Sequence, residues 1–160
     1  MTISLFFLKF DLEVFSLRNL WSEVLKDDQV KIPKEILEEQ SIYLQKMTKD
    51  LVYATVEDIT SYDDDADELA IDDSDLAFKF SLRSKYIGRY SFTLFAFTHG
   101  IEIYPVRMQL DSLIAKEIGM NTTIYAESEE VFIEHLEKIF GTKRTRTVIG
   151  AITKLANTYK

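Results

Sequence analysis

An acidic run between residues 57 and 75 places the strongest constraint on how this chain can fold. The run, EDITSYDDDADELAIDDSD, holds ten of the 27 acidic residues and neither Lys nor Arg. Carboxylates so close together repel one another and are costly to bury, so the run is expected to stay in solvent. The net charge of −8 leaves about +2 on the other 141 residues, so the acidity is local. We therefore expect an acidic connecting loop at about 57–75 between two structured segments.

The rest of the chain has the composition of a globular protein. Its 160 residues are 46% hydrophobic and include only five Gly and two Pro, which favours one globular domain spanning residues 1–160. The absence of Cys excludes disulfides and thiolate metal sites and suits a reducing compartment. The first ten residues are apolar but lack a basic leader, and Lys9 and Asp11 interrupt them well short of a membrane span. We therefore expect a cytoplasmic protein without a membrane partner.

Alternation of apolar and polar side chains predicts the strands. The segments with this pattern, or with short β-branched and aromatic runs, are residues 3–15, 51–60, 76–82, 90–98, 101–108 and 122–125. Pro105 cannot donate to a strand ladder, so the strand at 101–108 is predicted to be an edge or to be interrupted by a bulge. His99 and Gly100 predict a hairpin before it.

Helical spacing and end signals predict the helices. The expected helices cover residues 19–26, 34–47, 112–118, 129–140 and 148–159. Asp111 and Ser128 are the predicted N-caps, and Gly119 and Gly141 the predicted ends of the helices that they begin. The expected fold is therefore α+β, with a mainly antiparallel sheet and several helices packed on it.

Two interpretations of the acidic run remain open. It can be a solvated loop that aids solubility, or a docking surface whose field speeds encounter with a basic protein. Apolar side chains among the charges favour an interface, because interfaces use such residues as anchors. The predicted partner-binding residues are Asp63, Asp64, Asp65, Asp67, Glu68, Asp72, Asp73, Asp75, Tyr62, Leu69 and Ile71.

Metal and cofactor sites are not predicted. Asp63, Asp65 and Asp67 match the first, third and fifth positions of an EF-hand loop, but Glu68 and Ser74 stand where the motif requires Gly and Glu. Weak, nonspecific binding of divalent ions by the run stays open. The two histidines are far apart in the sequence and are interpreted as structural residues.

Catalytic motifs are also missing from the sequence, which contains no nucleophile elbow, phosphate loop, zinc-protease motif or dinucleotide fingerprint. The expected protein is therefore not an enzyme. A basic cluster of Lys143, Arg144 and Arg146 is expected to pair with Glu134, Glu137 or a second copy of the chain, which leaves homo-oligomerisation open. Direct binding of nucleic acid is not expected, because the acidic run would repel it.

In size, charge, predicted fold and the DDDADELAIDDSD segment, the chain resembles the small acidic immunity proteins of bacterial toxin systems, including contact-dependent growth inhibition. The resemblance implies a cytoplasmic, noncatalytic antitoxin that neutralises a basic partner, with a nuclease toxin domain as the natural candidate. Two alternatives stay open. One is a nucleic-acid mimic or adaptor that binds a different protein, and the other is a hydrolase that uses Asp or Glu residues.

Overall fold

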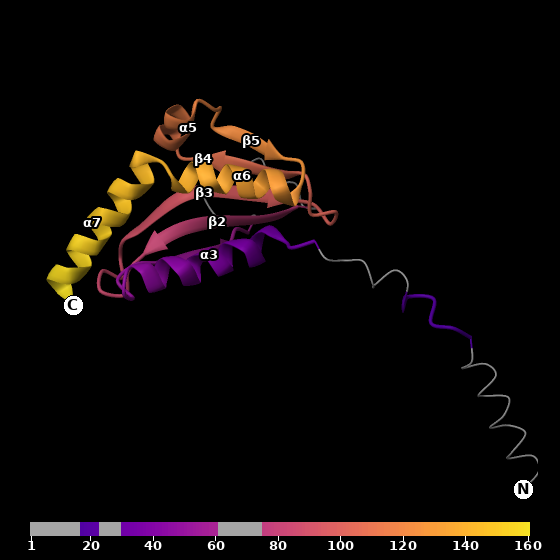
Figure 1. Cartoon of the computed structure of the whole chain (residues 1–160), viewed down its shortest axis with the longest axis horizontal. Coiled ribbons are helices and arrows are strands. Elements are labelled where there is room, and N and C mark those ends of the chain that lie inside the picture. Colours follow the sequence, from indigo (N-terminus) through magenta and orange to yellow (C-terminus); the bar gives the residue numbers. More distant parts are fainter. Residues whose placement is uncertain (1–16, 23–29, 61–74) are drawn as a thin grey trace, which may run out of the picture. The chain divides into compact units, whose positions relative to one another are not determined.

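The computed structural model describes residues 17–22, 30–60 and 75–160 (Figure 1). The predicted strand at 3–15, most of the predicted helix at 19–26 and most of the acidic run lie outside these residues. The chain divides into Met1–Val30 and Lys31–Lys160, and the fold below belongs to the second unit. The prediction of one domain spanning all 160 residues therefore stays a prediction.

Five strands form one antiparallel sheet in the order β1-β2-β3-β4-β5, so each strand pairs with its neighbours in sequence. They are β1 (Tyr53–Asp58), β2 (Leu76–Arg83), β3 (Ser91–His99), β4 (Val106–Leu110) and β5 (Thr123–Ala126). The helices of this unit are α3 (Pro33–Met47), α5 (Ser112–Ile118), α6 (Glu129–Phe140) and α7 (Lys143–Tyr159). The predicted α+β fold with an antiparallel sheet is confirmed.

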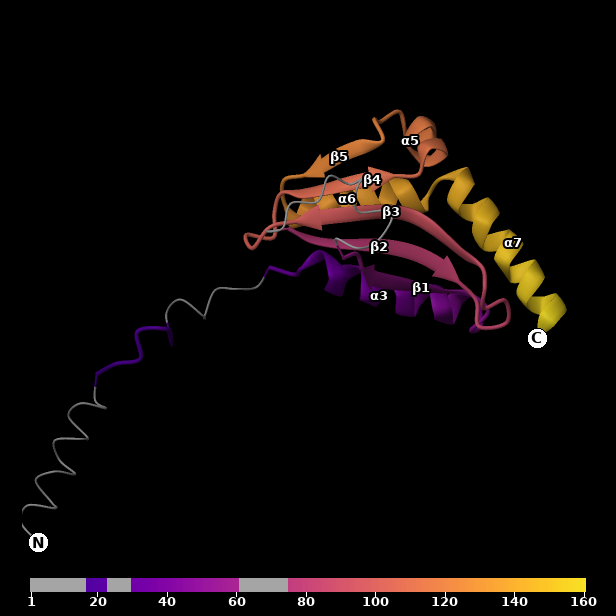
Figure 2. The ribbon, with the colours of Figure 1, turned by 180° about the vertical axis from the view of Figure 1, so that it is seen from behind.

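The two faces of the sheet differ because side chains alternate along each strand. Helices α3 and α6 lie across one face, and the view from behind shows the opposite face of the strands (Figures 1 and 2). Phe78 and Phe80 of β2 belong to the buried core, whereas Lys79 and Arg83 are only partly buried. One face of the sheet therefore builds the core and the other carries polar side chains.

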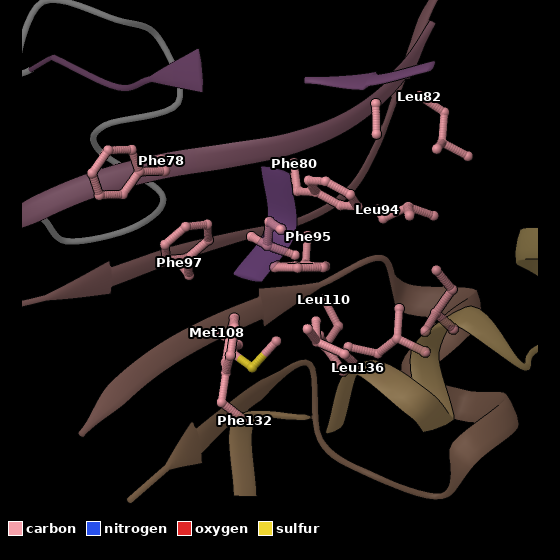
Figure 3. Packing of buried hydrophobic residues seen from close by; sticks show 14 of the residues in the cluster. Phe78, Phe80, Leu82, Leu94, Phe95, Phe97, Met108, Leu110, Phe132 and Leu136 are labelled. Atoms are coloured by element: carbon pink, nitrogen blue, oxygen red, sulfur yellow. The ribbon is translucent and has the colours of Figure 1, made fainter. Parts of the chain in front are cut away.

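Phenylalanine side chains contact one another within this core (Figure 3). The register places Phe78 opposite Phe97 on β3, and their ring centroids lie 5.1 Å apart. Phe97 also contacts Phe132 of α6, with 6.2 Å between the ring centroids. Both Phe97 and Phe132 are 0% exposed, so burial of large apolar surface holds α6 on the sheet.

A bulge interrupts the pairing of β2 with β3. Phe80 lies opposite Phe95, but the next residue, Ser81, lies opposite Thr93, so Leu94 is the extra residue. Leu94 and Phe95 are each only 1% exposed. The bulge thus allows two consecutive residues to be buried where strict alternation would bury one.

The edge of β1 is protected by hydroxyl groups of α3 and the residue that ends it. Ser41 Oγ donates to the Ala54 carbonyl at 2.6 Å and accepts from its N–H at 3.2 Å. Thr48 Oγ1 makes the same two contacts with Val52, each at 3.0 Å. These hydroxyls satisfy main-chain groups that would otherwise be open to pairing with another strand. They also fix the C-terminal end of α3 beside the start of β1.

The helix ends agree with the predicted signals. Asp111 Oδ2 accepts hydrogen bonds from the first turn of α5, and Gly119 ends that helix with a left-handed φ of 71°. Ser128 Oγ accepts from the Val131 N–H at the start of α6. Gly141 follows α6 as predicted, although with a right-handed conformation.

Two boundaries differ from the sequence predictions. The β4 strand begins at Val106, directly after the cis Tyr104–Pro105 bond, and pairs with both β3 and β5. Neither alternative predicted for this strand holds: it is not an edge, and its register with β3 and β5 is continuous, because Pro105 stands outside the ladder. Helix α7 begins at Lys143 instead of 148, since Thr142 caps it through the Thr145 N–H at 3.2 Å.

Candidate functional site

The acidic run joins two neighbouring strands at one end of the sheet. It begins within β1 and ends directly before β2, and the Ile59 N–H donates to the Ala77 carbonyl at 2.8 Å. Ile59 and Ala77 are 8% and 5% exposed and pack with Ala96 of β3. The two ends of the run are therefore held close together on a packed part of the sheet.

Most of the predicted partner-binding residues lie outside the described residues. These are Tyr62, Asp63, Asp64, Asp65, Asp67, Glu68, Leu69, Ile71, Asp72 and Asp73. The structure does describe Asp75, which is half-buried directly before β2. Their role in binding stays a prediction.

Glu57, the first carboxylate of the run, is paired within the fold. Its Oε1 lies 2.5 Å from Arg83 Nη2, and its Oε2 lies 3.7 Å from Lys79 Nζ. Partial burial raises the pKa of Glu57, but the hydrogen bond and the charge of Arg83 outweigh this and hold the pKa below its ordinary value. Glu57 therefore belongs to the polar face of the sheet and is less available to a partner.

A depression of about 590 Å³ opens at the same end of the sheet. Its lining residues belong to four parts of the chain. They are the last residue of the acidic run, the end of β3, the β3–β4 connection, and residues of β4 and β5 that lie opposite one another in the sheet. The lining residues are Asp75, Thr98, His99, Gly100, Ile101, Glu102, Tyr104, Pro105, Arg107 and Tyr125. The strand register sets Thr98 opposite Arg107 and Arg107 opposite Tyr125, so these side chains form one row across the sheet.

The side chains that line this depression include both buried and exposed ones. His99 is 7% exposed, its Nδ1 lies 2.8 Å from the Gly100 carbonyl, and its ring stacks on Phe78. By contrast, Ile101 and Tyr125 are 92% and 55% exposed. His99 thus supports the wall of the depression, and the two apolar side chains remain open to contact a partner.

Tyr104 connects the depression to the start of the helical layer. Its hydroxyl donates to the Lys31 carbonyl at 2.9 Å. Burial and the nearby charge of Glu129 raise the pKa of Tyr104 to about 12. The phenol therefore stays a neutral hydrogen-bond donor throughout the physiological pH range.

The helices add further carboxylates at this end of the unit. Helix α6 starts just after β5 leaves the depression, and a hollow of about 300 Å³ separates it from the first half of α3. Glu129 and Lys31 line that hollow near the start of α6, whereas Glu39 and Glu137 line it farther along α3 and α6. Lys31 Nζ lies 3.0 Å from Glu39 Oε1, and the main-chain N–H of Lys31 donates to Glu129 Oε2 at 3.3 Å. We call the acidic run, the depression and these helix starts the acidic end.

Cations gather at the opposite end of the sheet, which holds the C-terminus of α3, the β2–β3 turn and the C-terminus of α7. Tyr159 of α7 lines a shallow pocket with Tyr86 and Tyr90 of that turn. The exposed cationic side chains in these segments are Lys46, Lys49, Lys85, Arg89 and Lys160. The same segments contain the carboxylate side chain of Asp50. We call this region the cationic end.

The basic cluster in the first turn of α7 contacts other carboxylates than those predicted. Glu117 of α5 accepts hydrogen bonds from the N–H groups of Lys143 and Arg144, at 2.5 and 3.2 Å. These hydrogen bonds, that of Lys143 first, lower the pKa of Glu117. Arg144 Nε also lies 3.7 Å from Asp111 Oδ2. Asp111 and Glu117 thus take the place predicted for Glu134 or Glu137.

Groups for metal binding or acid–base chemistry are sparse in the part of the chain that the structure describes. There, no three His, Cys, Asp or Glu side chains gather closely enough to hold a metal ion. Asp75 and Glu102 both line the depression, but each lies in a connection and neither lies on a strand or helix. His135 lies on α6 and its Nε2 is 3.0 Å from the Tyr125 carbonyl, so it supports β5.

Sequence reasoning missed the residues that the fold brings beside the acidic run. Ile101, Tyr104 and Tyr125 come from positions 26 to 50 residues beyond Asp75, and only the register of five strands makes them neighbours. The sequence signal for this surface was Tyr125, the aromatic residue inside the short β5 segment. Without the strand order, it did not indicate which end of the sheet Tyr125 would occupy.

The fold and site together define an α+β protein with a five-stranded antiparallel sheet and an acidic connection at one sheet end. Comparison with protein-family models, curated proteins and solved structures found no match. Within the described residues, none of the helices combines the length and apolar character needed to cross a membrane.

Proposed function

We propose that this protein is a noncatalytic, immunity-type protein that binds a basic partner protein at its acidic end and neutralises it. A nuclease toxin domain is the partner class that fits this proposal best. A nuclease cleft is built to hold a polyanionic backbone, so clustered carboxylates can occupy the same positive surface or one beside it.

The observation that carries the proposal is the attachment of the acidic run. Eight of the ten carboxylates lie between two strand ends that are hydrogen-bonded to each other, Ile59 N–H to Ala77 C=O at 2.8 Å. A run anchored in this way is attached by both ends to one end of the sheet. Its long-range field therefore steers a basic protein toward a defined surface instead of acting at random.

The neighbouring depression supplies the other part of an interface. Charge speeds association, but affinity and specificity come mainly from buried apolar and aromatic anchors. Ile101 and Tyr125 are exposed beside Asp75, and Tyr104 is held in place by its hydrogen bond to Lys31. These side chains support a short-range contact to follow the electrostatic encounter.

A capture experiment tests the proposal. The full chain and a variant with Asn at Asp63, Asp64, Asp65, Asp72 and Asp73 serve as paired baits in extract of the source organism. We expect a basic protein to be retained by the wild type and lost from the variant. The purified partner should then lose its enzymatic activity, nuclease activity in the favoured case, when the wild-type chain is added.

A matched variant at the cationic end controls for nonspecific charge effects. Replacing Lys46, Lys49 and Lys85 by Gln should leave capture of the same partner unchanged. If the captured partner keeps its full activity when bound, the adaptor alternative replaces the immunity proposal. If no basic protein distinguishes the wild type from the Asn variant, the proposal is wrong.

A further inference from the structure

The helix-covered face of the sheet has a further hollow, which shares Gln40 and Phe140 with the hollow of about 300 Å³ described above. It measures about 180 Å³ and lies between α3, α6 and α7. Its lining residues are Gln40, Tyr43, Leu44, Met47, Phe80, Leu82, Leu94, Phe140, Thr145 and Ile149. Eight of these ten side chains are apolar or aromatic, and we call this site the apolar hollow.

The β2–β3 bulge and the divergence of two helices create the apolar hollow. The bulge directs Leu94 to the same face as Phe95, and Leu94 forms the floor with Leu82 and Phe80. Helices α3 and α7 flank this floor from different directions (Figure 1). On the rim, Tyr43 and Met47 are 58% and 83% exposed, so apolar surface continues from the floor to the mouth.

The polar groups in the lining differ in their availability. Thr145 Oγ1 donates to the Ile139 carbonyl at 2.8 Å and accepts from Thr142 Oγ1 at 2.9 Å, so it is already satisfied. In contrast, the side-chain amide of the half-buried Gln40 makes no hydrogen bond with any residue that the structure describes. Gln40 thus offers an N–H donor to a ligand whose chain lies on the apolar floor.

Cations lie near the mouth of the apolar hollow at Tyr43 and Met47, whereas Glu39 and Glu137 line the adjoining hollow on the far side of Gln40 and Phe140. Tyr43 and Met47 lie on the last turns of α3, where Lys46 and Lys49 follow within one turn. Lys85 and Arg89 lie on the turn that follows Leu82 and β2. Because Asp50 is the carboxylate side chain in these segments, the cationic end attracts a negative head group.

We propose that the apolar hollow binds a small anionic amphiphile, namely a free medium-chain carboxylate. Its volume of about 180 Å³ is large enough to admit a short aliphatic chain. The aliphatic chain lies on Leu82, Leu94 and Ile149, and the carboxylate lies at the mouth between Tyr43 and Met47, in the field of Lys46 and Lys49. The apolar surface supplies the affinity and the cations select the head group.

Octanoate is the probe that tests this site, with octyltrimethylammonium as a chain-matched cation. NMR titration of the full-length protein should show saturable shifts at the methyl groups of Leu44, Met47 and Ile149. We expect octanoate to bind at least about tenfold more tightly than the ammonium compound. Absence of saturable shifts at these methyl groups, or equal affinity for the two compounds, would contradict the proposal.

Two exposed positions on α3 provide a matched pair of variants. Met47→Glu places a carboxylate on the rim of the hollow and should weaken octanoate binding by about tenfold or more. Ile42→Glu makes the same charge change at a side chain that is 53% exposed and does not line the hollow. It should change the affinity less than about twofold. Equal losses in the two variants would show that general charge, and not this site, governs binding.

Discussion

The acidic end and the cationic end belong to the same sheet but are built from different kinds of structure. At the acidic end, much of the charge lies in the long connection between β1 and β2, beside the β3–β4 connection. At the cationic end, the charges lie on a short turn and on the last residues of α3 and α7. The comparison shows that one small unit can present fields of opposite sign at its two ends.

Helix direction accounts for part of this separation. Helices α3 and α6 both start at the acidic end, where Glu35, Glu129 and Glu130 occupy their first turns. Their last turns carry Lys46 and Lys138. Carboxylates stabilise helix N-termini and cations stabilise C-termini, so two helices pointing the same way separate charge along the sheet. The acidic run then strengthens a polarity that the helices already have.

The largest expected effect concerns the aromatic core that supports the acidic end. Phe97→Ala removes a side chain that is 0% exposed and contacts Phe78, Phe95 and Phe132. We expect it to lower the free energy of unfolding by about 3–5 kcal/mol, measured by urea denaturation. Met47→Ala on the rim of the apolar hollow should change the free energy of unfolding by less than about 0.5 kcal/mol. Similar losses of stability from the two variants would contradict the burial of Phe97 and the exposure of Met47.

The next effect concerns association. Replacing Asp63, Asp64, Asp65, Asp72 and Asp73 by Asn should slow association with the captured partner by about 10- to 100-fold at low salt. The salt dependence of the association rate should also flatten, because screening acts on fewer charges. Stopped-flow mixing at several salt concentrations measures both effects. An unchanged rate would remove the electrostatic part of the proposed function.

Thr142→Ala tests how the basic start of α7 is held. The Thr142 hydroxyl accepts from the Thr145 N–H and donates to Thr145 Oγ1, and the side chain is 3% exposed. Its loss should lower the free energy of unfolding by about 1–2 kcal/mol in thermal or urea denaturation. Thr158→Ala, which removes an exposed hydroxyl near the end of the same helix, is the control and should have little effect.

The smallest expected effect concerns Tyr104 at the acidic end. Tyr104→Phe removes the hydrogen bond to Lys31 and should lower the free energy of unfolding by about 0.5–1.5 kcal/mol near neutral pH. The pKa of Tyr104 is raised from 10.0 to about 12 in the folded protein, so its contribution is complete below pH 10. That contribution is lost as the pH rises from 10 to 12, because the unfolded phenol ionises first.

Denaturation measured across this pH range checks the Tyr104 prediction. The wild type should lose stability more steeply than Tyr104→Phe between pH 10 and 12. Parallel pH profiles for the two proteins would show that Tyr104 is not the group responsible. Tyr43→Phe, at a side chain that is 58% exposed, is the control for a general effect of losing a phenol.

Local patterns were sufficient to predict most of the elements in residues 31–160. Alternation predicted β2 and β3, and the caps Asp111 and Ser128 predicted the starts of α5 and α6, because both signals act within a few residues. The first turn of α7 was missed although its cap, Thr142, is a local signal, and the contact of Glu117 with that turn comes from 26 residues earlier in the chain. The central position of β4 likewise depends on β5, which follows it after a helix.

The candidate site also has parts that the sequence predicts and parts that only the tertiary structure shows. The charge of the acidic run follows directly from composition, whereas the depression beside it depends on the order and register of β3, β4 and β5. The internal pairing of Glu57 also required knowledge that Lys79 and Arg83 lie on the adjacent strand. Predicting such contacts requires tertiary pairing, which local periodicity does not contain.

The most direct test of the central claim is hydrogen–deuterium exchange of the full chain with and without the captured partner. The proposal predicts slower exchange in the partner complex at residues 98–107 and at the strand ends around Ile59 and Ala77. Exchange at residues 85–90 and in the second half of α7 should not change. Protection confined to the cationic end, with none at the acidic end, would contradict the account.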